Sequence, residues 1–331
     1  MIDLAEIARS LVAEGKGLLA ADESVHTATA RLALYGIAEG EDMRRAYRDL
    51  FLEAEGIERY LSGVILFSET FGERGSDGKW FPQSISARGV LAGIKVDEGT
   101  EPFPDSPKEF LTKGLFGLPE RFKEFREKGA TFAKWRAVFP IDGDRLPSSS
   151  AIVENAKRLA KYAREAQEYG IVPIVEPEVL LEGAHARARA EEVIKEVLGV
   201  LFAALAEQSV DLPALILKTA MALSGSASGR KDTPEEVAES TLAALLAAVP
   251  RKTGGVVFLS GGQSPEEATE NLAAVHRRAR IAGAPWPLTF SYARALQEEA
   301  LALWGGKPEN VAAARAAFLA RLAKVSAAVL P

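Results

Sequence analysis

Eight short apolar runs, most of them separated by helix-length amphipathic stretches, constrain the fold of this chain more than any other feature. The runs are LLAADES, GVILFSE, AGIKVDE, TFAKWRAV, IVPIVEPE, ALILKTAM, GVVFLSGG and PLTFSYAR, which begin at residues 18, 63, 92, 131, 171, 214, 255 and 287. Short apolar runs bounded by turn residues are typical of buried strands. Eight such strands alternating with helices over about 300 residues predict an α/β fold, a single (β/α)8 TIM barrel rather than an open sheet.

The segments outside these runs add detail to the predicted barrel. The opening MIDLAEIARSL has periodic Leu and Ile and predicts an amphipathic N-terminal helix, not a signal peptide. The connection from Phe71 to Val90, between the second and third strands, is rich in turn residues and predicts an irregular segment with one short helical turn. No low-complexity linker divides the chain, so we expect residues 1–331 to form one domain.

Composition narrows the classes of function. The chain has no cysteine and no apolar run of the roughly 20 residues that span a bilayer, which favours a cytoplasmic protein. A net charge of −6 argues against nucleic acid as a partner, yet a local basic cluster can still hold an anionic small molecule. His26, His185 and His276 lack metal-ligand spacing, and we expect the last two to be solvated, so a histidine metal site is disfavoured.

Polar residues follow almost every predicted strand at its C-terminal side, which in a barrel is the catalytic mouth. Because side chains alternate between the two faces of a strand, Lys134 and Arg136 share one face. The same spacing puts Glu176 and Glu178 on one face. The charged residues that we expect to converge are Asp22, Lys95, Lys134, Arg136, Glu176, Glu178, Lys218 and Arg294.

Lys218, which directly follows three aliphatic residues, is the candidate nucleophile. Burial and a nearby cation such as Lys134 can lower a lysine pKa from about 10.4 to about 7–8, a shift of roughly 4 kcal/mol. The neutral amine then forms an iminium with a ketone or aldehyde, and the iminium accepts electrons during C–C cleavage. Glu176 or Glu178 can transfer protons during dehydration, and Asp22 is the candidate base for cleavage.

The same residues have structural alternatives. Lys218 can lie along apolar surface with its ammonium in water. The four residues Lys134, Arg136, Glu176 and Glu178 can form a purely structural ion-pair network. The other polar strand ends that accompany Lys218 favour catalysis.

A phosphate site is indicated near the end of the seventh strand. Ser260, Gly261 and Gly262 allow backbone N–H groups to approach a phosphate closely. The following SPEE combines an N-cap, a first-turn proline and a capping-box acid, so we assign it to the start of a helix, as for TPEE at residues 233–236. Arg294 can clamp a phosphate or can be a surface arginine of the next helix.

Nine stretches together carry a family resemblance. They are GKGLLAADES, GVILFSETF, GIKVD, FAKWRAV, GIVPIVEPE, LILK, FLSGGQSPEEA, LTFSYARALQ and LWGG. In order and spacing they resemble class I fructose-bisphosphate aldolases across nearly the whole chain. The resemblance implies a metal-independent Schiff-base lyase of glycolysis and gluconeogenesis that needs no cofactor. It would reversibly cleave fructose 1,6-bisphosphate into dihydroxyacetone phosphate and glyceraldehyde 3-phosphate, as a cytoplasmic homo-oligomer, either tetramer or dimer.

The resemblance also implies roles for individual residues. Lys218 matches the Schiff-base lysine, and Lys134 its electrostatic partner. Glu176 matches the acid/base, Glu178 its neighbour in the lysine network, and Asp22 the cleavage base. The residues that match one phosphate site are Ser260, Gly261, Gly262, Ser291 and Arg294. Those that match the other are Ser24, Arg31, Lys95 and Arg136, with Thr27.

Three positions depart from the family pattern. Ala293 stands where a glycine is frequent, and its methyl is expected to crowd backbone that faces phosphate. After the lysine, Thr219, Ala220 and Met221 stand where the family commonly has Pro-Asn-Met, so the first two residues differ. No tyrosine follows Tyr292 to match a terminal tyrosine of many animal members, so we expect enamine protonation to be slower or to use another group, such as Glu176 through water.

Three alternatives stay open on sequence alone. Another Schiff-base barrel, a transaldolase or a deoxyribose-phosphate aldolase, would need only one phosphate cluster. A catalytically silent barrel could act as a scaffold, given the altered residues near Lys218 and Arg294. A metal-dependent aldolase or hydrolase could hold a divalent ion on carboxylates.

Overall fold

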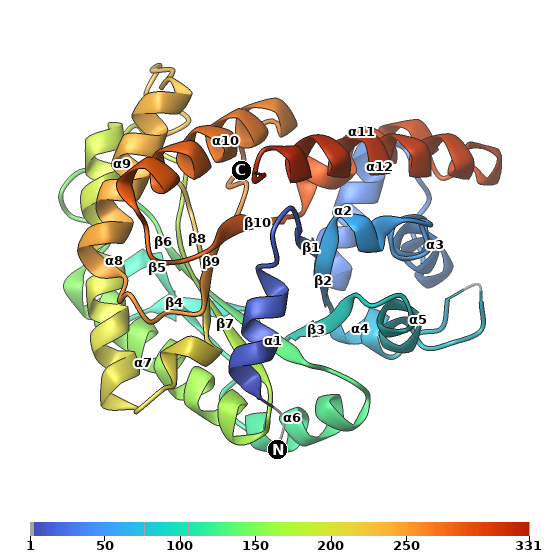
Figure 1. The fold of residues 1–331 in the computed structure, drawn as a ribbon, viewed down its shortest axis with the longest axis horizontal. Coiled ribbons are helices and arrows are strands. Elements are labelled where there is room, and N and C mark those ends of the chain that lie inside the picture. Colours follow the sequence, from blue (N-terminus) through green and yellow to red (C-terminus); the bar gives the residue numbers. More distant parts are fainter. Residues whose placement is uncertain (1–2, 76, 105, 331) are drawn as a thin grey trace.

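The computed structural model describes residues 3–75, 77–104 and 106–330, and its centre is a closed parallel barrel (Figure 1). The barrel strands are β1 (Gly17–Ala21), β2 (Leu61–Leu66), β3 (Leu91–Lys95), β6 (Phe132–Phe139), β7 (Val172–Val179), β8 (Ile216–Thr219), β9 (Gly255–Phe258) and β10 (Leu288–Tyr292). They close in the order β1-β10-β9-β8-β7-β6-β3-β2. Each overlaps one predicted apolar run, so the predicted (β/α)8 barrel is confirmed.

Helices surround this barrel, with α7 to α10 on one side and α2 to α5 on the other (Figure 1). The longer helices are α1 (Leu4–Leu11), α2 (Val25–Leu34), α3 (Glu41–Leu52), α6 (Leu118–Glu127), α7 (Ser149–Glu168), α8 (Arg187–Glu207), α9 (Pro234–Ala248), α10 (Pro265–Ala282), α11 (Arg294–Trp304) and α12 (Val311–Ala327). Short 3-10 helices are η1 (Ile57–Arg59), η2 (Leu212–Ala214) and η3 (Pro308–Asn310). No helix in the described ranges is both long and apolar enough to cross a membrane.

Helix starts follow the capping residues in the sequence. The Thr233 hydroxyl accepts a hydrogen bond from the Glu236 backbone N–H at the start of α9, and Ser264 and Glu267 repeat this arrangement at α10. Both capping boxes satisfy N–H groups that a helix cannot pair internally. The predicted N-terminal helix is confirmed as α1, while residues 1 and 2 of the predicted segment lie outside the described residues.

The connections on either side of β3 hold more structure than the sequence indicated. Between β2 and β3 lie two short helices, α4 (Ser68–Phe71) and α5 (Phe81–Ala87), instead of one helical turn. Residue 76 of this connection lies outside the description. Between β3 and β6, an antiparallel hairpin of β4 (Thr100–Phe103) and β5 (Ser106–Thr112) was not expected. Both strands contain prolines and β4 is largely exposed, so the hairpin gives little apolar signal.

Inside the barrel, an apolar layer of side chains is followed along the barrel axis by a charged layer. The inward-facing positions nearer the N-terminal ends of β6, β7 and β8 hold Phe132, Ile174 and Ile216. These three side chains form one buried cluster with Leu11 of α1. The next inward positions, two residues further on, are Lys134, Glu176 and Lys218. Burying each large apolar side chain contributes roughly 1.5–3 kcal/mol, so the apolar layer forms a stable floor beneath the charged one.

The Phe132 ring fits into the barrel because the nearby positions on β3 and β2 are glycines. A Cβ atom added at Gly93 would lie 2.2 Å from this ring, and one added at Gly63 would lie 3.0 Å from it. Interiors are packed so densely that the lower layer has no room for these atoms.

A carboxyl group in the β2–β3 connection gives a prediction about stability. Burial, together with the carboxylates of Glu69 and Glu41, raises the pKa of Glu73 to about 7. The folded chain therefore binds this proton more tightly than the unfolded chain, and the favourable contribution is lost as pH rises from about 4.5 through about 7. We expect Glu73→Gln to raise the thermal midpoint on the order of 2 °C more at pH 8 than at pH 4.5.

Thermal scans of both proteins at the two pH values check this expectation. Glu124→Gln is the control, because Glu124 lies on the surface of α6 with a side chain that is 57% exposed. A gain from Glu73→Gln that is equal at both pH values would contradict the assignment.

Candidate active site

A cavity of about 1200 Å³ opens at the C-terminal ends of the barrel strands. All predicted site residues except Gly262 line it: Asp22, Ser24, Arg31, Lys95, Lys134, Arg136, Glu176, Glu178, Lys218, Ser260, Gly261, Ser291 and Arg294. They come from separate parts of the sequence and converge because parallel strands end at the same face of a barrel. The cavity is therefore the candidate active site.

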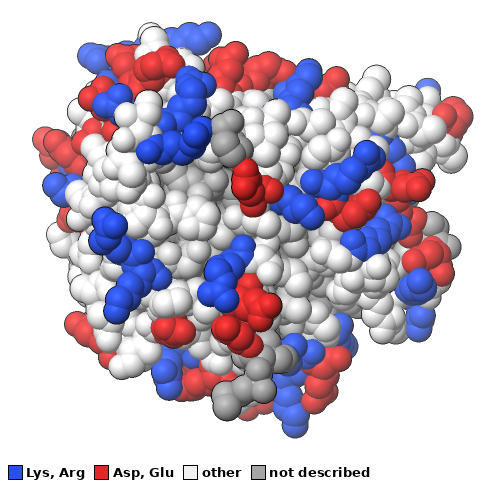
Figure 2. Space-filling view, viewed as in Figure 1, with Lys and Arg blue, Asp and Glu red and all other residues white. Residues whose placement is uncertain are grey.

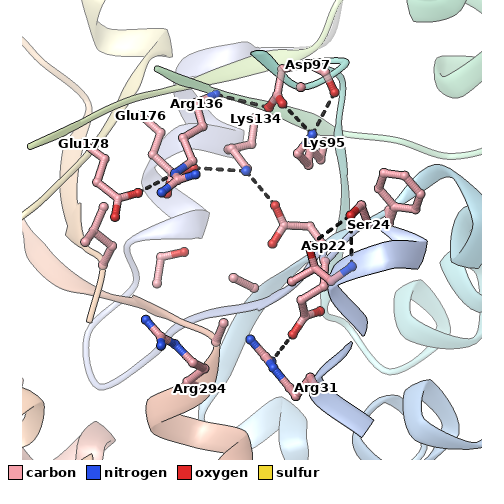
Figure 3. Close-up of a pocket in the computed structure, with 18 of the residues that line it drawn as sticks. Asp22, Ser24, Arg31, Lys95, Asp97, Lys134, Arg136, Glu176, Glu178 and Arg294 are labelled. Atoms are coloured by element: carbon pink, nitrogen blue, oxygen red, sulfur yellow. Dashed lines mark hydrogen bonds and ion pairs between the residues drawn. The ribbon is translucent and has the colours of Figure 1, made fainter. Parts of the chain in front are cut away.

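Four charged side chains of alternating sign form a continuous row in this cavity. Figure 3 shows three of them, Asp22, Lys134 and Glu176. Asp22 lies 2.6 Å from the Nζ atom of Lys134, and Lys134 lies 3.1 Å from Glu176. The other carboxylate oxygen of Glu176 lies 3.0 Å from Nζ of Lys218. All but Asp22 have side chains that are no more than 5% exposed. Glu176 is thus shared between two buried lysines.

This row fixes the charge state of its central groups. Burial opposes ionisation of Asp22, but Lys134 and Lys218 outweigh it and hold the pKa of that carboxyl below its usual range. Burial is likewise outweighed at Glu176, whose pKa is lowered by the same two lysines. Asp22 and Glu176 overcome burial at Lys134 and raise its pKa above the usual value. Lys134 is therefore a cation at neutral pH, separated from Lys218 by a carboxylate.

The arrangement suits proton transfer around an amine. A carboxylate within hydrogen-bond distance of a lysine can take its proton and return it to a departing hydroxyl. An uncharged amine can then bond to a carbonyl carbon. Asp22 lies on the far side of Lys134 from Glu176, so a second carboxylate faces a different part of any bound molecule.

A second ionic group lies beside the row. Glu178 pairs with the guanidinium of Arg136, and its place in the lysine network stays a prediction. The Asp97 carboxylate forms an ion pair with Lys95 Nζ at 2.5 Å and accepts a hydrogen bond from the Arg136 backbone N–H at 3.2 Å. Asp97 was not predicted, although it follows Lys95 by two residues and the alternation that identified Arg136 would have identified it too.

The loop after β9 and the end of β10 supply neutral donors. Gly261 and Gly262 have φ angles of +57° and +90°, which favour glycine over other residues. Gly262 does not line the cavity, but a Cβ there would lie 3.8 Å from a guanidinium nitrogen of Arg294. The buried Ser291 hydroxyl lines the cavity and has no hydrogen-bond partner among the described residues. Such an orphaned hydroxyl is suited to a ligand oxygen.

The backbone at Ala293, one of the departures from the family pattern, does not require glycine. Ala293 precedes α11 with a φ of −107°, where no left-handed conformation requires glycine.

The expectation that His185 is solvated was wrong: it is 9% exposed, and burial lowers its pKa. Within residues 3–75, 77–104 and 106–330, no three His, Asp or Glu side chains are grouped to hold a metal ion.

Arg31 reaches the cavity from α2. The residues that it contacts do not lie on β3 or β6, the strands that carry Lys95 and Arg136. Its guanidinium contacts Glu23, which follows Asp22, and Gln297 of α11 at 3.0 Å. Glu23 and Gln297 were not predicted. A glutamate beside Asp22 and a glutamine three residues after Arg294 were the only signals in the sequence.

The family described as fructose-bisphosphate aldolase class-I, a glycolytic family, matches residues 3–331. The chain belongs to this aldolase family. It is 46% identical over 301 residues to a probable class 1 fructose-bisphosphate aldolase from Xanthomonas axonopodis pv. citri, covering 91% of this chain and 89% of the relative. It is 48% identical over 317 residues to fructose-bisphosphate aldolase 4, cytosolic, from Arabidopsis thaliana, covering 96% of this chain and 80% of the relative.

A solved aldolase structure has the same fold. Fructose-bisphosphate aldolase from Plasmodium falciparum, in complex with TRAP and a small-molecule inhibitor, matches with a TM-score of 0.95 and 42% identity. The match covers 98% of this chain and 93% of that chain. This class I aldolase is therefore a lyase that cleaves fructose 1,6-bisphosphate, a reaction of glycolysis. The comparisons select this family over the other Schiff-base barrels and over a silent scaffold.

Proposed function

We propose that Lys218 is the amine that forms the Schiff base in this aldolase. The observation that carries the proposal is the 3.0 Å contact between Lys218 Nζ and Glu176 inside a buried row of charges. Attack of the amine on the C2 ketone of open-chain fructose 1,6-bisphosphate forms a C–N bond and a carbinolamine. One nitrogen proton passes to the C2 oxygen to complete the carbinolamine, and Glu176 then gives the C2 hydroxyl the proton that it took from the Lys218 nitrogen before the attack. The hydroxyl leaves as water while the nitrogen lone pair completes the C=N bond of the iminium.

Asp22 is the proposed base for the cleavage step. It takes the proton of the C4 hydroxyl, the C3–C4 bond breaks, and its electron pair moves into the iminium to give an enamine. Glyceraldehyde 3-phosphate leaves, and protonation at C3 followed by hydrolysis releases dihydroxyacetone phosphate. Lys134, 2.6 Å from Asp22 and 3.1 Å from Glu176, keeps both carboxylates in position and balances their charge.

The two phosphates are proposed to bind at opposite sides of the cavity. The C1 phosphate is adjacent to the C2 carbon, so it lies close to Lys218. β8 pairs with β9, which supports binding of this phosphate at the loop that follows β9 and at the end of β10. The proposed residues are Ser260, Gly261, Gly262, Ser291 and Arg294. The proposed residues for the second phosphate are Ser24, Arg31, Lys95 and Arg136, with Glu178 holding the Arg136 guanidinium.

One experiment tests the Schiff base directly. The protein is incubated with dihydroxyacetone phosphate, reduced with borohydride and digested, and the adduct is mapped by mass spectrometry. We expect one modified residue, Lys218. A stoichiometric adduct on another lysine, or none at all, would refute the assignment.

We also propose that residues 1–331 act as one domain in a cytoplasmic dimer or tetramer. One barrel formed by strands from residues 17 to 292 supports a single domain, and the cytosolic relative from Arabidopsis thaliana supports the location. Acidic and basic side chains are interspersed on the face in Figure 2, which with a net charge of −6 supports a small-molecule substrate over nucleic acid. Light scattering coupled to size exclusion measures the oligomeric state.

A further inference from the structure

Arg48 of α3 contacts Glu23, as Arg31 does, but does not line the cavity. Its side chain is 3% exposed, and its guanidinium holds Glu23 at two points. One nitrogen lies 2.5 Å from carboxylate Oε2, and the other donates to the Glu23 backbone carbonyl at 3.0 Å. The Arg48 guanidinium carbon also lies 5.0 Å from the centre of the Tyr47 ring. Arg48 thus fixes the residue between Asp22 and Ser24.

Among the residues that the structure describes, Arg31 makes its hydrogen bonds and its ion pair through a single nitrogen. Nη1 contacts Glu23 Oε1, the Tyr47 hydroxyl at 3.1 Å and Gln297 Oε1 at 3.0 Å. Arg31 lines the cavity with a side chain that is 15% exposed. A guanidinium carries donors on two further nitrogens, and these remain for a ligand.

Arg48 controls how much of Arg31 the Glu23 carboxylate can occupy. Glu23 has two oxygens, and Arg48 takes Oε2, so only Oε1 faces Arg31. Without Arg48, both oxygens would be available, and a carboxylate binds a guanidinium most strongly through two parallel hydrogen bonds. Such a bidentate pair would draw Arg31 away from a ligand.

The charges of this cluster favour an anion in the cavity. One carboxylate, Glu23, serves two guanidiniums, that of the buried Arg48 and that of the half-buried Arg31. Buried charges are stable when paired, so a phosphate on the free edge of Arg31 would complete the cluster.

We propose that Arg48 is a positioning residue that keeps Arg31 available for a substrate phosphate by engaging one oxygen of Glu23. The inference rests on the proposed function, because it takes Arg31 as a phosphate ligand. Arg48 touches no reacting atom, so its effect passes through Arg31 and appears in substrate affinity.

A double-mutant cycle tests this proposal. We expect Arg48→Met to raise KM for fructose 1,6-bisphosphate about 10- to 100-fold, with kcat within about threefold of the parent value. Arg31→Met should raise KM at least as much, and adding Arg48→Met to it should change KM by less than about twofold. Arg48→Lys keeps the charge but cannot hold Glu23 at two points, so a smaller rise in KM is expected.

Controls separate this role from a structural one. Arg45→Met, on the same helix, removes an exposed arginine paired with Asp42 and should leave KM unchanged. If Arg48→Met does not fold, Arg48→Lys takes its place in the cycle. An equal rise in KM with and without Arg31, or no rise at all, would overturn the proposal. Borohydride trapping of Lys218 in the parent protein is scored independently, so a failed Schiff base is distinguished from a failed role for Arg48.

Discussion

Replacement of Lys218 by methionine is expected to lower kcat/KM for fructose 1,6-bisphosphate by at least about 10⁴-fold. Methionine approximates the length of lysine but has no amine, so no C–N bond can form with the ketone. The side chain is 4% exposed and lies above an apolar layer, so the substitution is compatible with folding. Glu176 keeps Lys134 as a partner at 3.1 Å. The loss should therefore be chemical and not structural.

Steady-state kinetics, together with borohydride trapping, measures this loss. Lys195→Met is the matched control, because Lys195 is an exposed residue of α8 away from the cavity. Its activity and its adduct on Lys218 should equal those of the parent. Retention of even a tenth of the activity in Lys218→Met would eliminate the imine mechanism for this site.

Asp22→Asn should separate the two halves of the reaction. An amide cannot accept the C4 hydroxyl proton, so cleavage is expected to fall about 10²- to 10⁴-fold. Imine formation with dihydroxyacetone phosphate should persist, since the Lys218 and Glu176 pair at 3.0 Å is untouched. Asp22 also forms an ion pair with Lys134, so the variant leaves Glu176 as the ion-pair partner of that ammonium and Asp97 as a further nearby carboxylate.

The two activities are measured on the same preparation. Cleavage is followed as triose phosphate release, and the imine as the borohydride adduct of Lys218. Asp42→Asn, at a position whose side chain is 93% exposed, controls for loss of a surface carboxylate. If Asp22→Asn lost trapping and cleavage to the same extent, Asp22 would be required for imine formation, contrary to a role confined to cleavage.

Local patterns account for what the sequence predicted well. The alternation of side chains along a strand was enough to place Lys134 and Arg136 on one inward face, and the barrel brought Glu176 and Lys218 beside them. Capping residues such as Thr233 identified helix starts because the hydrogen bonds involved span only three residues. Such features depend on near neighbours that can be read from the sequence.

Features set by distant contacts could not be predicted in the same way. Arg48 reaches Glu23 across 25 residues, and no spacing rule connects them. The pairing of Glu178 with the Arg136 guanidinium on the neighbouring strand likewise follows from no spacing rule. The β4–β5 hairpin is held by contacts such as the hydrogen bond that the Thr112 hydroxyl donates to the Arg136 carbonyl at 2.8 Å. The polar residues of these strands do not indicate such contacts in the sequence. Tertiary structure decides each of these pairings.

The tight fit of Phe132 against Gly93 and Gly63 limits how this enzyme can change. Any larger residue at Gly93 would have to displace the Phe132 ring, which lies two residues before Lys134. The base of the pocket therefore tolerates almost no substitution. New substrate preferences would have to arise in the loops around the opening, where side chains can vary without disturbing the reactive amine. The loops around the opening can therefore change substrate preference, while the packed layers inside the barrel preserve the chemistry.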